Sequence, residues 1–343
     1  MLSVANLLGS FLSRSSGGST AKIGSFQWVH TSYHKPGLLL EMAQSVIPPL
    51  TFNTHKGLAG RIAVIGGSKE YTGAPYFAAI SALKVGADLS HVFCTEGASP
   101  VIKSYSPELI VHPILESKFA VHETSEWLEK MHAVVLGPGL GTDPVICLDI
   151  AKNILEEVKK KNLPLVVDAD GVFLLTEYPD IIKSYGKAIL TPNVVEFERL
   201  FQKVMGEKPK PEEPVLAVKV LSRALGNVTI VKKGHNDIIS DGENVKKDHN
   251  DIISDGENVL VCCSEGSPRR CGGQGDLLSG AMGTFSYWAH KAIERGTDNA
   301  LLSLYGPNLC AAYAACLLTK DHHLKHCLNR LVLDHFGWNK CNM

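Results

Sequence analysis

Short apolar runs rich in β-branched residues alternate with longer helical stretches from residue 60 onward, and this alternation constrains the fold most strongly. Strands are predicted at RIAVIGG (61–67), LSHVFC (89–94), HAVVLG (132–137), LPLVVDAD (163–170), KAILTP (187–192) and NVTIVKK (227–233). Helices are predicted at APYFAAISALKVGA (74–87) and PVICLDIAKNILEEVKKK (144–161). Continuously apolar strands separated by helices form parallel sheets that are covered on both faces. The sequence therefore predicts an α/β fold, with a central mostly parallel sheet and helices on both faces.

Polar turn residues follow five of the predicted strands. The segments are GGSKEYTGAP (66–75), GPGLGTD (137–143), DADG (168–171), TPNVVE (191–196) and KKGHND (232–237). Ligands of parallel α/β sheets bind outside the carboxyl ends of the strands. Any one of these segments reads as a plain turn, but five at the same edge predict a ligand-binding cleft.

A glycine-rich segment, CGGQGDLLSG (271–280), precedes a predicted helix at 280–293. A glycine loop that opens a helix presents backbone N–H groups and the positive end of the helix dipole, which suits a phosphate. Gly272, Gly273 and Gly275 allow close backbone approach, and Asp276 falls in the first helical turn, where the dipole alone also favours it. The loop lacks the Lys-Ser/Thr pair of a P-loop and lies too late in the chain for a Rossmann fingerprint.

The order Gly273-Gln274-Gly275-Asp276 resembles the G-[AT]-G-D signature of ribokinase-like folds. Residues 45–320 more closely resemble the ATP-dependent NAD(P)H-hydrate dehydratase family, a ribokinase-like group of metabolite-repair enzymes. The segments that carry the resemblance are 60–89, SPELIVHP (106–113), GPGLG (137–141), VVDADG (166–171), LTPNVVEFERL (190–200) and GSPRRCGGQGDLLSG (266–280). The resemblance implies a hydro-lyase that uses ATP and Mg²⁺ to restore the S-form of hydrated NADH or NADPH, with NAD(P)H-hydrate epimerase as a separate functional partner.

The resemblance also implies roles for individual residues. Asp276 would be the general base on the C6 hydroxyl of the hydrated nicotinamide ring, whose phosphorylation makes it a good leaving group. The ATP-binding residues would be Lys233, Gly234, His235, Asn236, Asp237, Ser267, Arg269, Arg270, Cys271, Gly272, Gly273, Gln274 and Gly275. The hydrate-binding residues would be Gly139, Gly141, Asn193, Val194, Val195, Glu196, Phe197, Glu198, Arg199 and Asp276. Glu196 would hold Mg²⁺ through water, although Asn193 and Glu196 also fit a helix cap with its capping-box partner, and the two roles are compatible.

Two other readings remain open. A ribokinase-like kinase for a vitamin precursor would share Asp276 and the glycine loop but release a stable phosphorylated product. An NAD(P)-binding protein that has lost activity would bind nucleotide without turnover. The segments YTGAP, GPGLG and TPNVVEF favour the dehydratase.

A tandem duplication interrupts the resemblance. VKKGHNDIISDGEN (231–244) and VKKDHNDIISDGEN (245–258) differ only in Gly234 against Asp248. Each copy predicts a strand followed by an Asp-Gly turn, and one position in a sheet accommodates one copy. We expect the first copy to supply the nucleotide segment, because Gly234 takes positive φ without steric cost. Residues 246–259 would then be a duplicated insert.

The two ends of the chain differ from its middle. The first 40 residues contain no Asp or Glu and are rich in serine, which is typical of a mitochondrial transit peptide; a disordered leader is the alternative. We assign 1–45 to this leader, 46–320 to the ribokinase-like domain and 321–343 to a divergent tail. In that tail His322, His323, His326 and Cys327 lack a second cluster that would complete a metal site.

Composition limits the classes of partner. The net charge of −1 gives no argument for nucleic-acid binding, and we expect no membrane span. Nine scattered cysteines without a CxxC pair predict reduced thiols in an intracellular protein. The leader predicts a mitochondrial protein; an additional cytoplasmic pool stays open, and so does homo-oligomerisation.

Overall fold

The computed structural model describes residues 36–49, 52, 55–234, 237–240, 245–248, 251–256, 258–262, 272–297 and 299–336. Eleven strands lie in these ranges: β1 (Arg61–Ile65), β2 (Leu89–Cys94), β3 (Ile110–Pro113), β4 (Ala133–Leu136), β5 (Leu165–Val167), β6 (Ala188–Leu190), β7 (Thr229–Lys232), β8 (Asp237–Ser240), β9 (Val245–Asp248), β10 (Asp251–Ser254) and β11 (Val259–Cys262). The six predicted strands are confirmed, and β3 was not predicted.

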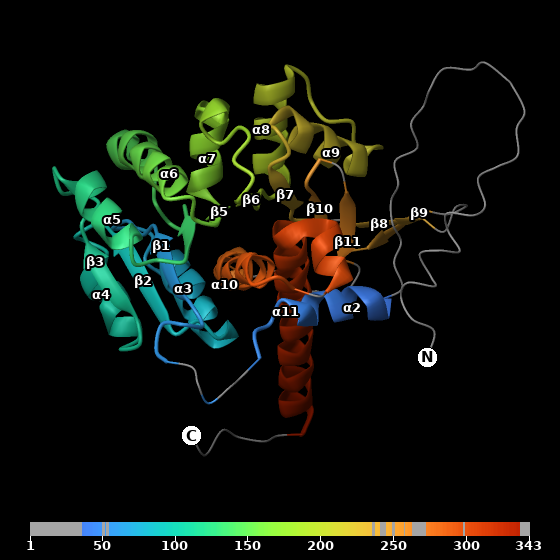
Figure 1. Cartoon of the computed structure of the whole chain (residues 1–343), viewed down its shortest axis with the longest axis horizontal. Coiled ribbons are helices and arrows are strands. Elements are labelled where there is room, and N and C mark those ends of the chain that lie inside the picture. Colours follow the sequence, from blue (N-terminus) through green and yellow to red (C-terminus); the bar gives the residue numbers. More distant parts are fainter. Residues whose placement is uncertain are drawn as a thin grey trace, which may run out of the picture. The chain divides into compact units, whose positions relative to one another are not determined.

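Nine of these strands form one sheet, in the order β11-β10-β7-β6-β5-β4-β1-β2-β3. Strands β1 to β7 run parallel, whereas β10 is antiparallel to both β7 and β11. The predicted α/β class with a mostly parallel sheet is thus confirmed (Figure 1).

Helices pack on both faces of this sheet. They are α2 (Pro36–Ser45), α3 (Gly73–Val85), α4 (Ser99–Tyr105), α5 (Ala120–Leu128), α6 (Ala151–Lys160), α7 (Asp170–Glu177), α8 (Val194–Met205), α9 (Pro214–Ala224), α10 (Gln274–Glu294) and α11 (Ala300–Phe336), with a π-helical segment η1 (Val145–Ile150) and a 3₁₀ turn η2 (Pro179–Ile181). Successive strand side chains point to opposite faces. Val64 therefore joins the apolar cluster under α2, α3, α10 and α11, and Ile65 joins the cluster under α5 to α9.

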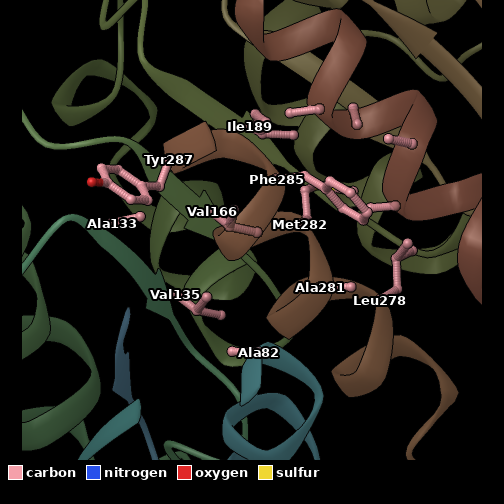
Figure 2. Close-up of a cluster of buried hydrophobic side chains, with 14 of the residues drawn as sticks. Ala82, Ala133, Val135, Val166, Ile189, Leu278, Ala281, Met282, Phe285 and Tyr287 are labelled. Atoms are coloured by element: carbon pink, nitrogen blue, oxygen red, sulfur yellow. The ribbon is translucent and has the colours of Figure 1, made fainter. Parts of the chain in front are cut away.

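Helix α10 lies across the middle of the sheet. Figure 2 shows Met282 and Phe285 of this helix beside Val135, Val166 and Ile189 of β4, β5 and β6. Gly280 lets α10 approach α3 closely, because a Cβ atom built on it would lie 1.9 Å from the carbonyl oxygen of Ala78. This packing fixes the position of the N-terminal turn of α10, which carries Asp276.

The folded part begins earlier in the chain than we predicted. Residues 36–45, which we assigned to the leader, form α2, and its Met42 is fully buried in the core. Residues 1–35 lie outside the described residues. Helix α11 continues beyond residue 320 to Phe336, and the side chains of residues 321–336 are not described.

Part of α11 has the length and composition of a membrane span. Within Ala300–Lys320, an 18-residue window has a mean hydropathy of 1.4, but 61% of that window is buried inside the fold. Its Leu309 and Cys310 belong to the core cluster under α10, so the stretch serves as a core helix. Five of the described cysteines are buried in the fold: Cys94, Cys147, Cys262, Cys310 and Cys316.

The prediction for the duplicated segment is wrong in one respect. Strand β10, from the second copy, pairs with β7 in the large sheet, whereas β8 of the first copy pairs with β9 in a separate two-stranded sheet. The extra residues therefore lie between Gly234 and Asp251, not at 246–259. This arrangement keeps the Asp255-Gly256 turn between β10 and β11 intact, with the N–H of Asn258 donating to Asp255 Oδ1 at 2.7 Å.

Candidate functional site

The five polar segments meet at one edge of the sheet, because β7, β6, β5, β4 and β1 are consecutive neighbours. Hydrogen bonds join them. The N–H of Gly67 donates to the Gly139 carbonyl at 3.0 Å, and that of Lys233 donates to the Pro192 carbonyl at 2.9 Å. The predicted gathering of these segments is confirmed.

A buried ion pair lies at the centre of this edge. The Nζ of Lys233 is 2.6 Å from Oδ1 of Asp168, whose side chain is 2% exposed. The hydroxyl of Thr191 donates to the same oxygen at 2.8 Å. Burial lowers the pKa of Lys233, but the carboxylates of Asp168 and Glu196 outweigh it and raise the pKa overall. Lys233 is therefore held as an ammonium ion.

The turn after β5 directs two carboxylates into the site. Its central residue, Ala169, takes φ 47° and ψ −118°, a strained combination for a residue other than glycine. Asp170, on the far side of the turn, accepts the N–H of Gly141 at 2.9 Å. Burial raises the pKa of Asp170, and the nearby charge of Asp168 adds to the rise.

The glycine loop opens α10 as predicted. Gly273 has φ +90° and α10 begins at the next residue, so the first N–H groups of the helix have no partners within it. A Cβ atom on Gly273 would lie 2.9 Å from the Phe77 ring, and one on Gly275 would lie 3.4 Å from Lys233 Nζ. A side chain at Gly273 would therefore collide with the Phe77 ring, whereas one at Gly275 would be in ordinary contact with the Lys233 ammonium.

Asp276 lies in the first turn of α10, partly buried among other charges. Burial and then repulsion from Asp168 raise its pKa, Lys233 lowers it, and the result is about 6. A pKa near the working pH suits a general base, because the group is ionised and still accepts a proton readily.

Asn193 and Glu196 form the predicted capping box at the start of α8. The N–H of Glu196 donates to Asn193 Oδ1 at 3.0 Å, and the N–H of Asn193 donates to Glu196 Oε2 at 2.8 Å. Burial raises the pKa of Glu196, and Lys233 opposes this. Further along α8, Phe197 is fully buried in the core, so it lies beneath the site as a packing residue.

Other predicted site residues are only partly accounted for. Gly139 and Gly141 abut Tyr71 and Ser68, where a Cβ atom would come within 2.8 Å and 3.0 Å of an oxygen. Asp237 begins β8, outside the large sheet. The remaining ATP-binding predictions, His235, Asn236, Ser267, Arg269, Arg270 and Cys271, lie outside the described residues.

Sequence reasoning missed two residues of this site. Asp168 and Thr191 were recognised only as members of polar turn segments, although each follows a buried strand directly. Among the side chains that the structure describes, no group of three or more His, Cys, Asp or Glu is placed to hold a metal ion. A hollow of about 660 Å³ near α5 and η1, lined in part by Phe119 and Val145, contains none of the predicted site residues.

Comparison with known proteins gives consistent matches. The family model described as NAD(P)H-hydrate dehydratase matches residues 62–330. The chain is 53% identical over 283 residues to the ATP-dependent (S)-NAD(P)H-hydrate dehydratase of Bos taurus, covering 82% of this chain and 80% of that protein.

Solved structures share the fold. A ribokinase-like superfamily protein from Enterococcus faecalis matches with a TM-score of 0.62 and 22% identity, over 83% of this chain and 87% of that one. An ADP/ATP-dependent NAD(P)H-hydrate dehydratase from Bacillus subtilis, co-crystallised with ATP and Mg²⁺, matches with a TM-score of 0.57 and 18% identity, over 82% and 86%.

Proposed function

This chain belongs to the NAD(P)H-hydrate dehydratase family, and from that membership we propose that Asp276 and the glycine loop of α10 carry its reaction. The protein is an ATP-dependent hydro-lyase of metabolite repair, which acts on hydrated NAD(P)H. The observation that carries the assignment of the site is the position of Asp276, in the first turn of α10 and beside the Lys233 ammonium.

The residues present fit the terminal phosphates of ATP. The glycine loop places the start of α10 next to the Lys233 ammonium, which lies 3.4 Å from a Cβ atom built on Gly275, and a helix start offers N–H groups and a positive dipole end to a phosphate. Lys233 adds a full positive charge. Glu196 keeps one carboxylate oxygen outside its capping hydrogen bond and would hold Mg²⁺ through water; bound Mg²⁺ would neutralise phosphate charge.

The first step is phosphoryl transfer to the C6 hydroxyl. Asp276 accepts the hydroxyl proton as the new O–P bond forms and the bond between the β and γ phosphates of ATP breaks. Such transfer depends on positioning and charge stabilisation more than on covalent chemistry by the protein. The glycine loop and Lys233 supply both.

The second step is elimination. The C6–O bond breaks with the electron pair of the ring nitrogen assisting, and phosphate leaves with that bond's electrons. The C5 proton then passes to water, and the C5–H electron pair restores the C5=C6 double bond. Phosphate is a far better leaving group than hydroxide, which is why the reaction needs ATP.

Replacement of the base tests this proposal. We expect Asp276→Asn to abolish recovery of NADH absorbance from hydrated NADH and ATP, while ATP affinity measured by calorimetry stays nearly unchanged. Wild-type activity in the variant would remove Asp276 from the role of base.

The same assay separates the alternatives. A vitamin-precursor kinase would consume ATP only with another acceptor, and an inactive nucleotide-binding protein would show no turnover. We also propose a mitochondrial location, which fractionation of cells would test, and cooperation with a separate NAD(P)H-hydrate epimerase.

A further inference from the structure

Asp168 is the most buried charged group at the candidate site, and the proposed reaction gives it no role. Its side chain is 2% exposed, and burial of an unpaired carboxylate is costly. Two partners satisfy one of its oxygens, Lys233 Nζ at 2.6 Å and the Thr191 hydroxyl at 2.8 Å. A fixed donor from β6 thus orients the carboxylate toward the lysine that follows β7.

The Lys233 ammonium reaches the glycine loop from this anchor. An ammonium has three N–H donors, and Asp168 occupies one of them. The position 3.4 Å from a Cβ atom built on Gly275 places Nζ against the first turn of α10. Two N–H donors of the ammonium remain beyond the one that Asp168 accepts.

We propose that Asp168 is a positioning residue for the phosphoryl transfer: it holds the Lys233 ammonium beside the glycine loop and keeps it from collapsing onto Asp276. This inference rests on the proposed function of the loop and deepens it. Lys233 then contacts the transferring phosphoryl group, while Asp276 stays unpaired and able to accept the substrate proton.

The charges around Asp276 explain why such an anchor is needed. Asp168 and Asp170 after β5, Lys233 after β7 and Glu196 on α8 all influence this cluster. Lys233 is the cation that counters Asp276 in it. Without Asp168, the nearest strong partner for the ammonium is the base itself, and a base paired with an ammonium is a weaker proton acceptor.

Asp168→Asn tests the proposal, since asparagine keeps the size and the hydrogen bond from Thr191 but not the charge. We expect kcat to fall roughly 10- to 100-fold, the size of one charge-assisted hydrogen bond, and the KM for ATP to rise. The acid limb of the kcat profile should also move below its wild-type position near pH 6, because Asp276 loses a repulsive neighbour and gains an attractive one.

A purely structural role for Asp168 would predict otherwise. It would lower the melting temperature and the activity at every pH without moving the acid limb. A double-mutant cycle with Lys233→Met sharpens the distinction. If Asp168 acts through Lys233, Asp168→Asn costs little further activity in the Lys233→Met background, whereas additive losses would overturn the proposal.

Two further measurements keep the test decisive. If Asp168→Asn does not fold, Thr191→Val removes the orienting hydroxyl without changing charge and should raise the KM for ATP several-fold; an unchanged KM and acid limb would overturn the inference. Calorimetry with ATP alone reports on the Lys233 position independently of turnover. Failure of the wild-type protein to dehydrate NADH hydrate would instead count against the proposed function.

Discussion

Removal of residues 235–248 should stabilise the protein and preserve its activity. These residues contain β8 and β9, which pair with each other and with no strand of the large sheet among the described residues. A two-stranded hairpin alone is marginal in water, so its loss should cost little. Lys233 and Gly234 precede the deletion, and β10 follows it, so the site and the sheet both keep their residues.

The register sets the size of the effect. Residues 233–251, nineteen in number, separate the paired positions Lys232 and Ile252, and five remain after the deletion. The entropic cost of loop closure grows as three-halves of RT times the logarithm of loop length, which gives a gain of about 1 kcal/mol. In a domain of this size that corresponds to a rise in melting temperature of roughly 2–4 °C.

Urea unfolding and a turnover assay measure the two halves of the prediction. A variant with residues 235–248 replaced by fourteen Gly and Ser residues is the matched control, because it keeps the loop length and should show no gain. The reasoning fails if the deletion lowers the free energy of unfolding by more than 1 kcal/mol or abolishes turnover, since either result would mean that β8 and β9 support the fold or the site.

Two more predictions concern packing and acid stability. Gly280→Ala should lower the free energy of unfolding, measured in urea, by roughly 1–3 kcal/mol or more, because the new Cβ atom would meet the Ala78 carbonyl oxygen at 1.9 Å. Gly186→Ala is the control, because a Cβ atom there meets nothing within 4 Å. This control should change the free energy of unfolding by less than about 0.5 kcal/mol. Burial, followed by the charges of His112 and Arg61, lowers the pKa of His91 to about 4. Below pH 6.5 the unfolded chain therefore takes up a proton at His91 that the folded protein does not take up. The free energy of unfolding should fall by about 3 kcal/mol between pH 6.5 and 4 for this reason. His91→Gln should make that decline shallower in urea titrations at each pH, and an unchanged slope would contradict the assignment.

The parallel core of the sheet was predictable from sequence because each of its strands is apolar on both faces. Strand β3 was not predicted because it is an edge strand of the sheet. Its Ile110 is partly exposed, and Pro113 ends its short apolar sequence. Helix α10 begins at Gln274, six residues before our predicted start, because glycines disfavour a helix in isolation and packing on the sheet overrides that preference.

The duplicated segment shows a limit of a different kind. Deleting residues 235–248 or residues 245–258 leaves the same amino-acid sequence, because the copies are identical after Gly234. The amino-acid sequence alone therefore cannot show which of the two copies is the inserted one. The answer lies in strand pairing: Ile253 opposes both Val231 of β7 and Leu260 of β11, and the tight turn at Asp255-Gly256 connects it to the latter.

The role of Asp168 could not be predicted from sequence either, because it also depends on how the strands pair. In sequence, DADG after a strand reads as a turn, and its 65-residue separation from Lys233 gives no reason to pair the two. The pairing follows from topology, because β6 alone separates β5 from β7 in the sheet and Thr191 at the end of β6 bridges the gap with its hydroxyl. Three parallel strands thus bring an acid, a hydroxyl and an ammonium to one edge, and α10 brings the base to the same point. The charge of the site is set by strand order, so residues like Asp168 are found by asking which strand ends are neighbours, not by reading motifs one at a time.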